Sequence, residues 1–175
     1  MKILGIIPAR YDATRFPGKI LAPILEKSMI RRVYAQACKS TILSKVIVAT
    51  DDKRIVDHVI NIGGDVLLTS KKHNSGTERC NEALALIESD FDAVINIQGD
   101  EPFIDPEQIT QVGDLLNDSS VEIVTLAKKI NSAEEFLDDN TPKVIFDKKR
   151  IATNFLRRID AKSKDISSLI KKNTF

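Results

Sequence analysis

The stretch that decides the fold is ILGIIPARYDATRFPGK, residues 3–19. It opens with an apolar run: Ile3, Leu4, Ile6 and Ile7. A short, β-branched run without polar alternation predicts a strand that is buried on both faces. We expect Pro8 to end this strand, because proline has no N–H to donate to a sheet ladder. Three cations follow the proline: Arg10, Arg15 and Lys19.

Beyond this stretch, buried-type runs alternate with amphipathic segments along the chain. Further strands are predicted over residues 45–50, 66–69, 93–97, 123–128 and 143–147. Helices are predicted over residues 29–41, 54–62, 77–88, 106–116 and 133–137, with Ser28 and Asp105 as N-caps. The alternation predicts an α/β protein of three-layer, Rossmann-like architecture, in which helices cover both faces of a mostly parallel sheet.

Composition excludes several classes of protein. The 175 residues are 42% hydrophobic and 29% charged, as in ordinary globular domains. A net charge of +1 gives no field for nucleic acid or anionic membranes, so neither is an expected partner. No apolar run approaches the roughly 20 residues of a membrane span. Without a leader, and with Cys38 and Cys80 interpreted as reduced thiols, the chain is expected to be cytoplasmic.

Loops that follow parallel strands gather at one edge of a sheet, where ligands of open α/β sheets bind. Two guanidiniums and an ammonium in the first such loop suit a polyanion such as a triphosphate. The alternative is that these cations are simply solvated. The loop matches neither the Walker pattern nor the dinucleotide fingerprint, so phosphate binding here would depend on side chains and local amides.

Three further segments are candidates for the same edge. The first, 49–51, offers Thr50 and Asp51 as borders of a base or ribose. In the second, 98–102, Asp100 follows a buried strand and suits a hard divalent cation, although it could equally cap a helix or turn. The third, 73–79, begins with a histidine that is either a general base or a solvated loop residue. It also places Arg79 where a cation opposes the helix dipole, which suggests a ligand-binding role.

Taken together, four motifs resemble those of the 3-deoxy-manno-octulosonate (Kdo) cytidylyltransferases, also called CMP-Kdo synthetases. They are IIPARYxxTRFPGK at 6–19, VATD at 48–51, SGTER at 75–79 and NxQGDEP at 96–102. The segment PKV at 142–144, with Asp147, continues the likeness. Four motifs in order at matching separations are far more specific than any one of them.

The resemblance implies a fold of the nucleotide-diphospho-sugar transferase type. It implies transfer of CMP from CTP to Kdo, with Mg²⁺ as cofactor, for lipopolysaccharide biosynthesis, and a homodimer in the full-length family. It also implies that Arg10, Lys19 and Asp100 are catalytic, that Asp100 binds the metal, and that Arg79 and Gln98 lie near the sugar acid. The implied nucleotide-binding residues are Pro8, Ala9, Arg10, Arg15, Lys19, Thr50, Asp51, Ser75 and Gly76.

The sequence departs from the family in two places. Asp12 and Ala13 stand where the family commonly has alanine and serine, so the loop gains a negative charge and loses a hydroxyl. Family members are also longer at the carboxyl end. We therefore expect a nucleotide-binding domain over residues 1–150, followed at 151–175 by an arm or the truncated start of a sugar-binding and dimerisation part. Two alternatives remain: a nucleotide-binding module without turnover, or a same-fold transferase for another sugar acid.

Overall fold

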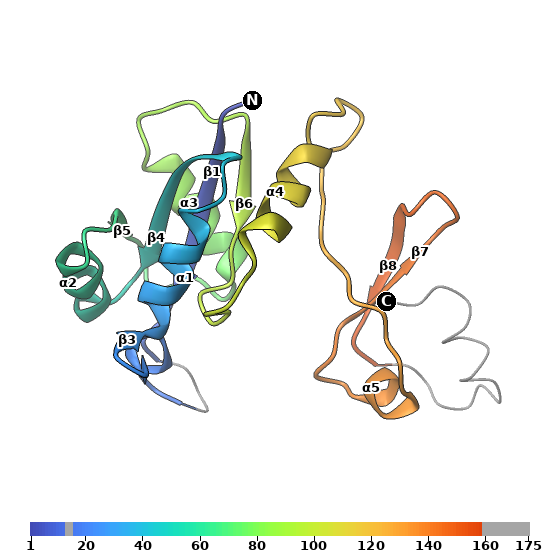
Figure 1. Cartoon of the computed structure of the whole chain (residues 1–175), viewed down its shortest axis with the longest axis horizontal. Helices are drawn as coiled ribbons and strands as arrows, with labels where there is room; N and C mark the ends of the chain where they lie inside the picture. Colours follow the sequence, from blue (N-terminus) through green and yellow to red (C-terminus); the bar gives the residue numbers. More distant parts are fainter. Residues whose placement is uncertain (13–15, 159–175) are drawn as a thin grey trace. The chain divides into compact units, whose positions relative to one another are not determined.

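The computed structural model describes residues 1–12 and 16–158 of the chain. They fall into two compact units, with the division between Val124 and Thr125 (Figure 1). Among these residues no helix has the length and apolar character that crossing a bilayer requires. The first unit holds the sheet and every site residue predicted from the sequence except Arg15, which lies outside the described ranges.

The first unit is built on a four-stranded sheet. Its strands are β1 (Ile3–Ala9), β4 (Leu43–Thr50), β5 (Val66–Leu68) and β6 (Ala93–Asn96). They lie side by side in the order β5-β4-β1-β6, and every pair is parallel. In the register, Ile6 of β1 lies opposite Ile47 on one side and Asn96 on the other. The predicted parallel sheet is confirmed, with the first strand of the chain in an interior position.

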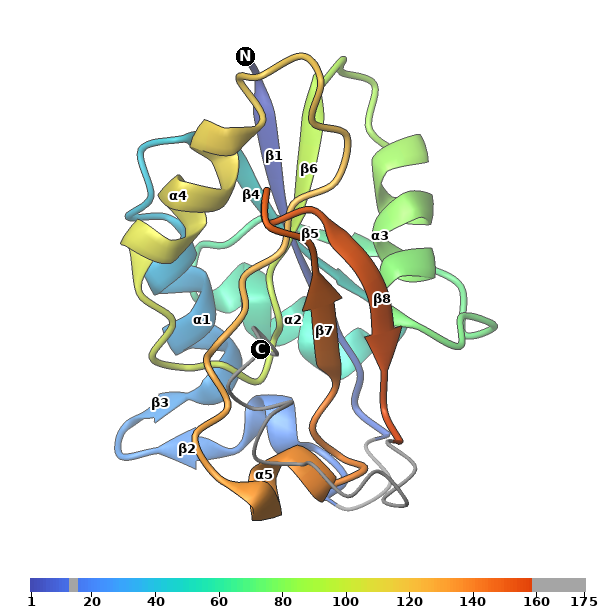
Figure 2. The ribbon, with the colours of Figure 1, turned by 90° about the vertical axis from the view of Figure 1, so that its right-hand side faces the viewer.

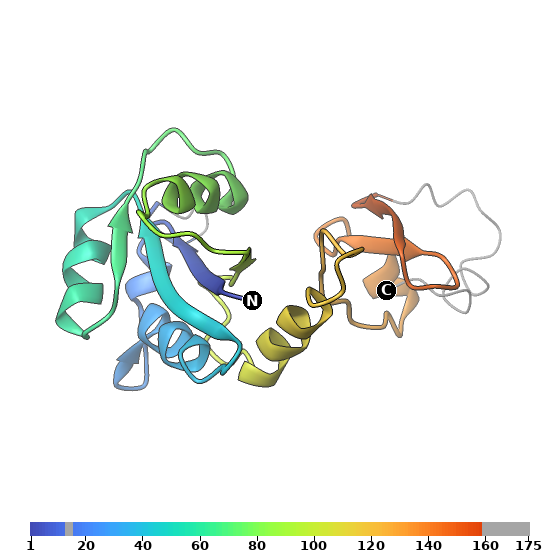
Figure 3. The same cartoon turned by 90° about the horizontal axis from the view of Figure 1, so that it is seen from above.

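Helices cover both faces of this sheet, as predicted (Figure 3). Three of them, α1 (Met29–Ala37), α2 (Lys53–Asn61) and α4 (Pro106–Leu115), pack into the core that contains Ile3 and Ile7. On the other face, α3 (Gly76–Ala85) packs against Leu4 and Ile6. Because β1 alternates between two apolar cores, its uninterrupted run of apolar residues is explained.

The predicted helix caps are present. Ser28 Oγ accepts a hydrogen bond of 3.3 Å from the Arg31 amide at the start of α1. Asp105 Oδ1 accepts one of 3.0 Å from the Glu107 amide at the start of α4. Each cap satisfies an amide that the helix itself leaves without a partner, and so fixes where the chain turns into the helix.

The expectation that Pro8 ends the first strand is wrong. β1 continues to Ala9, and Pro8 lies opposite Ala49 of β4. The pairing with β6 ends at Ile6, so beyond that point β1 has a strand on one side only. Proline is tolerated where one side of a strand carries no ladder, because its missing N–H is not needed there.

The predicted strand over residues 123–128 is also absent from the structure. This segment pairs with no strand in the described ranges, and Ile123 is 90% exposed. Apolar, β-branched residues favour a strand only when a neighbouring strand is available to pair with them. Shorter elements that the sequence did not predict are the 3₁₀ helix Lys19–Leu21 and the small hairpin of β2 (Pro23–Ile24) and β3 (Lys27–Ser28).

The second unit contains α5 (Ala133–Leu137), as predicted, and an antiparallel pair (Figure 2). The pair is formed by β7 (Lys143–Phe146), which was predicted, and β8 (Ala152–Leu156), which was not. Its buried apolar side chains include Ile130 and Phe136. Lys143 is also buried, and its ammonium donates hydrogen bonds to the carbonyl oxygens of Asp138 and Arg157.

Candidate nucleotide site

The carboxyl ends of β1, β4, β5 and β6 lie at one edge of the sheet, because all four strands run in the same direction. The loops after β1 and β6 meet at Gly99. A β-carbon at this position would lie 2.9 Å from the Pro8 carbonyl oxygen and 3.2 Å from Ile20 Cδ1. Glycine therefore allows the loop after β6 to pack directly on the end of β1.

This packing brings Lys19 and Asp100 together. Lys19 Nζ donates a hydrogen bond of 2.8 Å to Asp100 Oδ2, across 81 residues of sequence. The two side chains are 37% and 50% exposed. An ion pair so open to solvent contributes little to stability, since water screens it. Both charged groups are accordingly accessible to a ligand.

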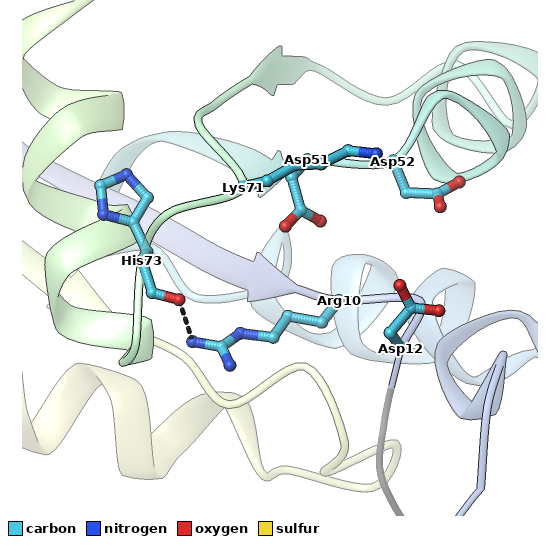
Figure 4. A pocket seen from close by; sticks show the side chains of 6 residues that line it. All are labelled: Arg10, Asp12, Asp51, Asp52, Lys71 and His73. Carbon is cyan, nitrogen blue, oxygen red and sulfur yellow. Dashed lines mark hydrogen bonds between the residues drawn. The ribbon is translucent and has the colours of Figure 1, made fainter.

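Arg10 points from the end of β1 toward the loop after β5. Its Nη2 donates a hydrogen bond of 2.9 Å to the carbonyl oxygen of His73 (Figure 4). The side chain is exposed and makes no ion pair within the described residues. A guanidinium that binds only a neutral carbonyl keeps the capacity to bind a phosphate oxygen.

A cavity of about 190 Å³ opens beside Arg10. Figure 4 shows the side chains around it, which come from the loops after β1, β4 and β5. The lining residues are Arg10, Asp12, Asp51, Asp52, Lys71 and His73. Three carboxylates and two cations give this cavity a mixed polar wall.

Two of the three carboxylates are already neutralised by arginines. Asp51 Oδ2 lies 2.8 Å from Arg79 Nη2. Asp52 is bound by both ends of the Arg54 guanidinium, and these hydrogen bonds lower the pKa of the Asp52 carboxyl. The third carboxylate, Asp12, makes no ion pair with any residue that the structure describes. Arg10 and Lys71 outnumber it, so the wall as a whole favours an anion.

Arg79 is fully buried, with 0% exposure, and its charge is used within the protein. Nη1 donates to Thr69 Oγ1 at 2.6 Å and to the Ser70 carbonyl at 3.4 Å, while Nη2 binds Asp51. Among the buried side-chain atoms that the structure describes, Arg79 Nε alone has no partner. The guanidinium thus joins the loops after β4 and β5, and the nearby carboxylate explains how the first turn of α3 tolerates a cation.

His73 is neither a solvated loop residue nor a histidine with free ring nitrogens. Its side chain is 18% exposed; Nε2 is hydrogen-bonded to Glu82, and Nδ1 lies 3.9 Å from Glu78. Glu82 also accepts from the Ser70 amide at 2.9 Å. The hydrogen bond with His73, followed by the one from Ser70, lowers the pKa of the Glu82 carboxyl. Glu78 and Glu82 of α3 therefore hold the loop after β5 in place. In this loop the carbonyl oxygen of His73 accepts the hydrogen bond from Arg10.

The remaining predicted residues lie at the same edge. Ala9 is buried, and so is Thr50, whose hydroxyl accepts from the Asp52 amide at 3.2 Å. Ser75 caps α3 by accepting from the Glu78 amide at 3.1 Å. A β-carbon at Gly76 would lie 3.2 Å from Pro8 Cγ, so the start of α3 adjoins the end of β1. Gln98 is exposed on the loop after β6.

Sequence reasoning did not find Asp52, Lys71 or the contact between His73 and Glu82. Asp52 carries a recognisable signal, since an aspartate directly before an amphipathic helix is a typical N-cap. Its side chain accepts from the Arg54 amide in that role. Lys71 and Glu82 look like ordinary solvated charges in the sequence, and only the tertiary structure places them at the site.

The donor set fits a divalent cation with few protein ligands. No group of three or more histidine, cysteine or acidic side chains within the described residues is placed to hold a metal ion. Asp100 supplies one exposed carboxylate. Mg²⁺ commonly takes only one or two carboxylates and completes its octahedron with substrate phosphates and water, so Asp100 suits such a site.

Comparison with known proteins gives a consistent result. The family model described as cytidylyltransferase matches residues 4–167. A 3-deoxy-manno-octulosonate cytidylyltransferase of Parabacteroides distasonis is 48% identical over 163 residues, covering 91% of this chain and 64% of the relative. One of Bacteroides thetaiotaomicron is 49% identical over 162 residues, with the same two coverages. This chain thus spans less than two thirds of the length of these relatives.

Solved structures agree. A structure of CMP:2-keto-3-deoxy-manno-octonic acid synthetase complexed with CTP has a TM-score of 0.86 and 34% identity. The match covers 95% of this chain and 68% of that one. A cytidylyltransferase of Leptospira borgpetersenii matches 67% of this chain and 50% of its own, with a TM-score of 0.58 and 26% identity.

Proposed function

This chain belongs to the 3-deoxy-manno-octulosonate (Kdo) cytidylyltransferases within the cytidylyltransferase family, and we propose that it transfers CMP from CTP to Kdo. The products are CMP-Kdo, an activated sugar for lipopolysaccharide biosynthesis, and pyrophosphate. The reaction joins a sugar hydroxyl to the α-phosphorus of the nucleotide. The proposed site is the sheet edge that carries Arg10, Lys19 and Asp100.

The observation that carries the proposal is the contact of 2.8 Å between Lys19 and Asp100. It places a cation for phosphate oxygens beside a carboxylate for the metal ion that accompanies them. When CTP binds, Lys19 exchanges the carboxylate for a β- or γ-phosphate oxygen, and Asp100 becomes available to the metal. Without substrate, Lys19 and Asp100 thus bind each other. When CTP and its metal ion bind, Lys19 contacts a phosphate oxygen and Asp100 contacts the metal ion.

Phosphoryl and nucleotidyl transfer depend mainly on positioning and on neutralising charge. In the proposed reaction the sugar hydroxyl oxygen bonds to the α-phosphorus as the bond to the β-phosphate breaks in line. The proton of the hydroxyl passes to solvent water, and pyrophosphate leaves with the bonding electrons. Arg10 and Lys19 offset the charge that builds up on the phosphate oxygens. We assign the same task to Arg15 on the basis of the sequence motif alone.

We propose that the cofactor is Mg²⁺, held by Asp100. When bound, the ion supplies charge neutralisation and a fixed geometry for the phosphate oxygens. The cavity beside Arg10 is the proposed place for the nucleoside, bordered by Asp51 and by the loop that Ser75 and Gly76 close. The polar side chains that line this cavity of about 190 Å³ can donate hydrogen bonds to a pyrimidine base and its ribose and accept them.

On the sugar side, Gln98 is the residue that we propose to contact Kdo, because it is exposed beside Asp100. Arg79 also matches the family motif, but its burial favours a supporting role through Asp51. The homodimer remains a prediction that follows from the family, and the cytoplasmic location remains one that follows from the sequence.

The proposal is tested with purified protein, CTP, Kdo and Mg²⁺, by following pyrophosphate release and by detecting CMP-Kdo with phosphorus NMR. We expect product only when all three additions are present, and much less product when UTP or ATP replaces CTP. CTP binding without product would mean that this chain is a nucleotide-binding module. Product with a different sugar acid, but not with Kdo, would overturn the assignment of the acceptor.

A further inference from the structure

The loop between Arg10 and Lys19 is closed at its base by Tyr11 and Gly18. The Gly18 amide donates a hydrogen bond of 2.7 Å to the Tyr11 carbonyl. Gly18 has a φ of +74°, and a β-carbon there would lie 3.2 Å from the hydroxyl end of the Tyr11 ring. Glycine suits this position on both counts, because other residues rarely adopt a positive φ and would press on the ring.

A second contact holds the same ring from outside the loop. The guanidinium carbon of Arg54, in the first turn of α2, lies 3.2 Å from the centroid of the Tyr11 ring. A cation over an aromatic face is attracted by the ring's quadrupole. Tyr11 is itself half-buried and packs against the core of the first unit. The Tyr11 ring therefore packs against the core, Gly18 and Arg54.

Arg54 is fixed in turn by Asp52. Nε binds Asp52 Oδ1 at 2.8 Å, and Nη2 binds Oδ2 at 2.5 Å. Oδ1 of the same carboxylate also accepts the Arg54 amide at 2.9 Å as the N-cap of α2. This bidentate contact orients the guanidinium plane, which a flexible lysine could not do. The loop after β1 is thus connected to α2, the helix that follows the neighbouring strand β4.

We propose that Arg54 is a positioning residue, which holds Arg10 and Lys19 at the spacing required by a triphosphate by stacking on Tyr11. The geometry supports this because Arg10 directly precedes Tyr11 and Lys19 directly follows Gly18. A contact that fixes Tyr11 and Gly18 at the base of the loop therefore also fixes the distance between Arg10 and Lys19. The inference rests on the proposed function, since it assumes that this loop binds the phosphates of CTP.

Arg54→Gln is the central test, with Lys53→Gln as its matched control. Both residues are exposed and are neighbours in the first turn of α2. Each substitution removes one positive charge. We expect Arg54→Gln to raise the dissociation constant for CTP with Mg²⁺ about two- to fivefold, the range of an exposed cation–π contact. Lys53→Gln should change it less than about twofold. Equal changes in the two variants would overturn the proposal.

Variants of the ring separate stacking from charge. Tyr11→Phe keeps the aromatic face and should bind CTP like the wild type, whereas Tyr11→Leu should match Arg54→Gln. The double variant Tyr11→Leu/Arg54→Gln should lose no more than either single one, since both remove the same contact. If the two losses multiply, Arg54 acts by another route and the proposal is wrong. Urea unfolding midpoints of all variants show that each one is folded.

A measurement without nucleotide distinguishes this inference from the proposed function. The Gly18 amide, bonded to Tyr11, should exchange its hydrogen faster in Arg54→Gln than in the wild type or Lys53→Gln, at unchanged global stability. If the wild type fails to bind CTP, the proposed function fails. If Gly18 exchanges at the same rate in all three proteins, Arg54 does not hold the loop, whether or not CTP binds.

Discussion

At the scale of single residues, the site depends on side chains that bind one another and exchange these partners for a ligand. Lys19 and Asp100 illustrate this, since each is exposed and each has the other as its ion-pair partner. Arg10 is similar, because the carbonyl of His73 is a neutral partner that a phosphate can replace. Contacts of this kind contribute little to stability, so substitutions should affect binding more than folding.

Lys19→Ala should weaken CTP binding by about 1.5–3 kcal/mol, the size of a hydrogen bond to a charged group. The loss should be smaller for CMP, because the ammonium has no β- or γ-phosphate to bind in the monophosphate. Calorimetric titrations with the two nucleotides measure the difference. If both nucleotides lose equal affinity, Lys19 does not bind the outer phosphates.

Asp100→Asn should remove the dependence of CTP affinity on Mg²⁺, while the shape of the side chain is kept. The amide is a much weaker ligand for a hard cation than the carboxylate. Titrations of CTP with and without Mg²⁺, in the wild type and the variant, give the comparison. Asp105→Asn changes the charge of the exposed N-cap of α4, where asparagine can also serve as the cap, and should leave the metal effect intact. An unchanged metal effect in Asp100→Asn would rule out the assignment.

Arg79→Met tests whether the buried guanidinium serves the fold. It should destabilise the protein by about 3–5 kcal/mol, the cost of leaving one member of a buried pair alone. The double variant Arg79→Met/Asp51→Asn should recover part of that loss, because the stranded carboxylate is also removed. Urea unfolding measures both. A stable Arg79→Met variant with a raised KM for Kdo alone would instead assign Arg79 to the sugar.

At the scale of secondary-structure elements, α3 anchors the loop before it through Glu78 and Glu82. The pKa of Glu82 is lowered in the folded protein by its hydrogen bonds to His73 and Ser70. A lowered folded pKa contributes stability above the ordinary value near 4.3 and loses it as pH falls through the folded value. Acidification below about pH 4.3 should therefore loosen this anchor.

Glu82→Gln should flatten the pH dependence of stability in that range. We expect the urea midpoint of the wild type to fall from pH 6 to pH 3 more steeply than that of the variant. Glu88→Gln, in the exposed segment after α3, should behave like the wild type. A variant as acid-sensitive as the wild type would show that the hydrogen bond of Glu82 with His73 does not contribute.

The elements also show which parts of the fold follow from the sequence. The four strands of the parallel sheet and the helices α1 to α4 were predicted because their apolar periods and caps are local features, as at Ser28 and Asp105. Two errors came from non-local causes. Pro8 stays within β1 because the ladder with β6 has already ended. Residues 123–128 form no strand, since they pair with no strand in the part of the chain that the structure describes, and pairing cannot be read from a single segment.

The candidate site divides in the same way. The sheet edge and the residues Arg10, Lys19 and Asp100 were predictable, because parallel strands place their following loops together. The contacts between loops were not predictable. The stacking of Arg54 on Tyr11 and the hydrogen bond between His73 and Glu82 join residues with no characteristic spacing in the sequence. The domain boundary expected near residue 150 remains a prediction, while the compact units divide at Val124.

At the scale of the whole molecule, ligand binding should appear as added stability. CTP with Mg²⁺ at 100 times its dissociation constant adds about 2.7 kcal/mol to the free energy of unfolding. For a chain of this size that corresponds to a rise of about 5–10 °C in Tm. Differential scanning fluorimetry measures it, with Lys19→Ala at the same CTP concentration as control. No rise in the wild type would contradict nucleotide binding.

The interior position of β1 has a consequence for biosynthesis. β1 pairs with residues 43–50 on one side and with residues 93–96, much later in the sequence, on the other. The side of β1 that faces β6 must therefore remain unpaired until residues 93–96 have been made. Such late, long-range pairing slows folding and leaves an apolar segment open to aggregation. We expect ribosome-stalled chains that end before β6 to be protease-sensitive and to bind chaperones.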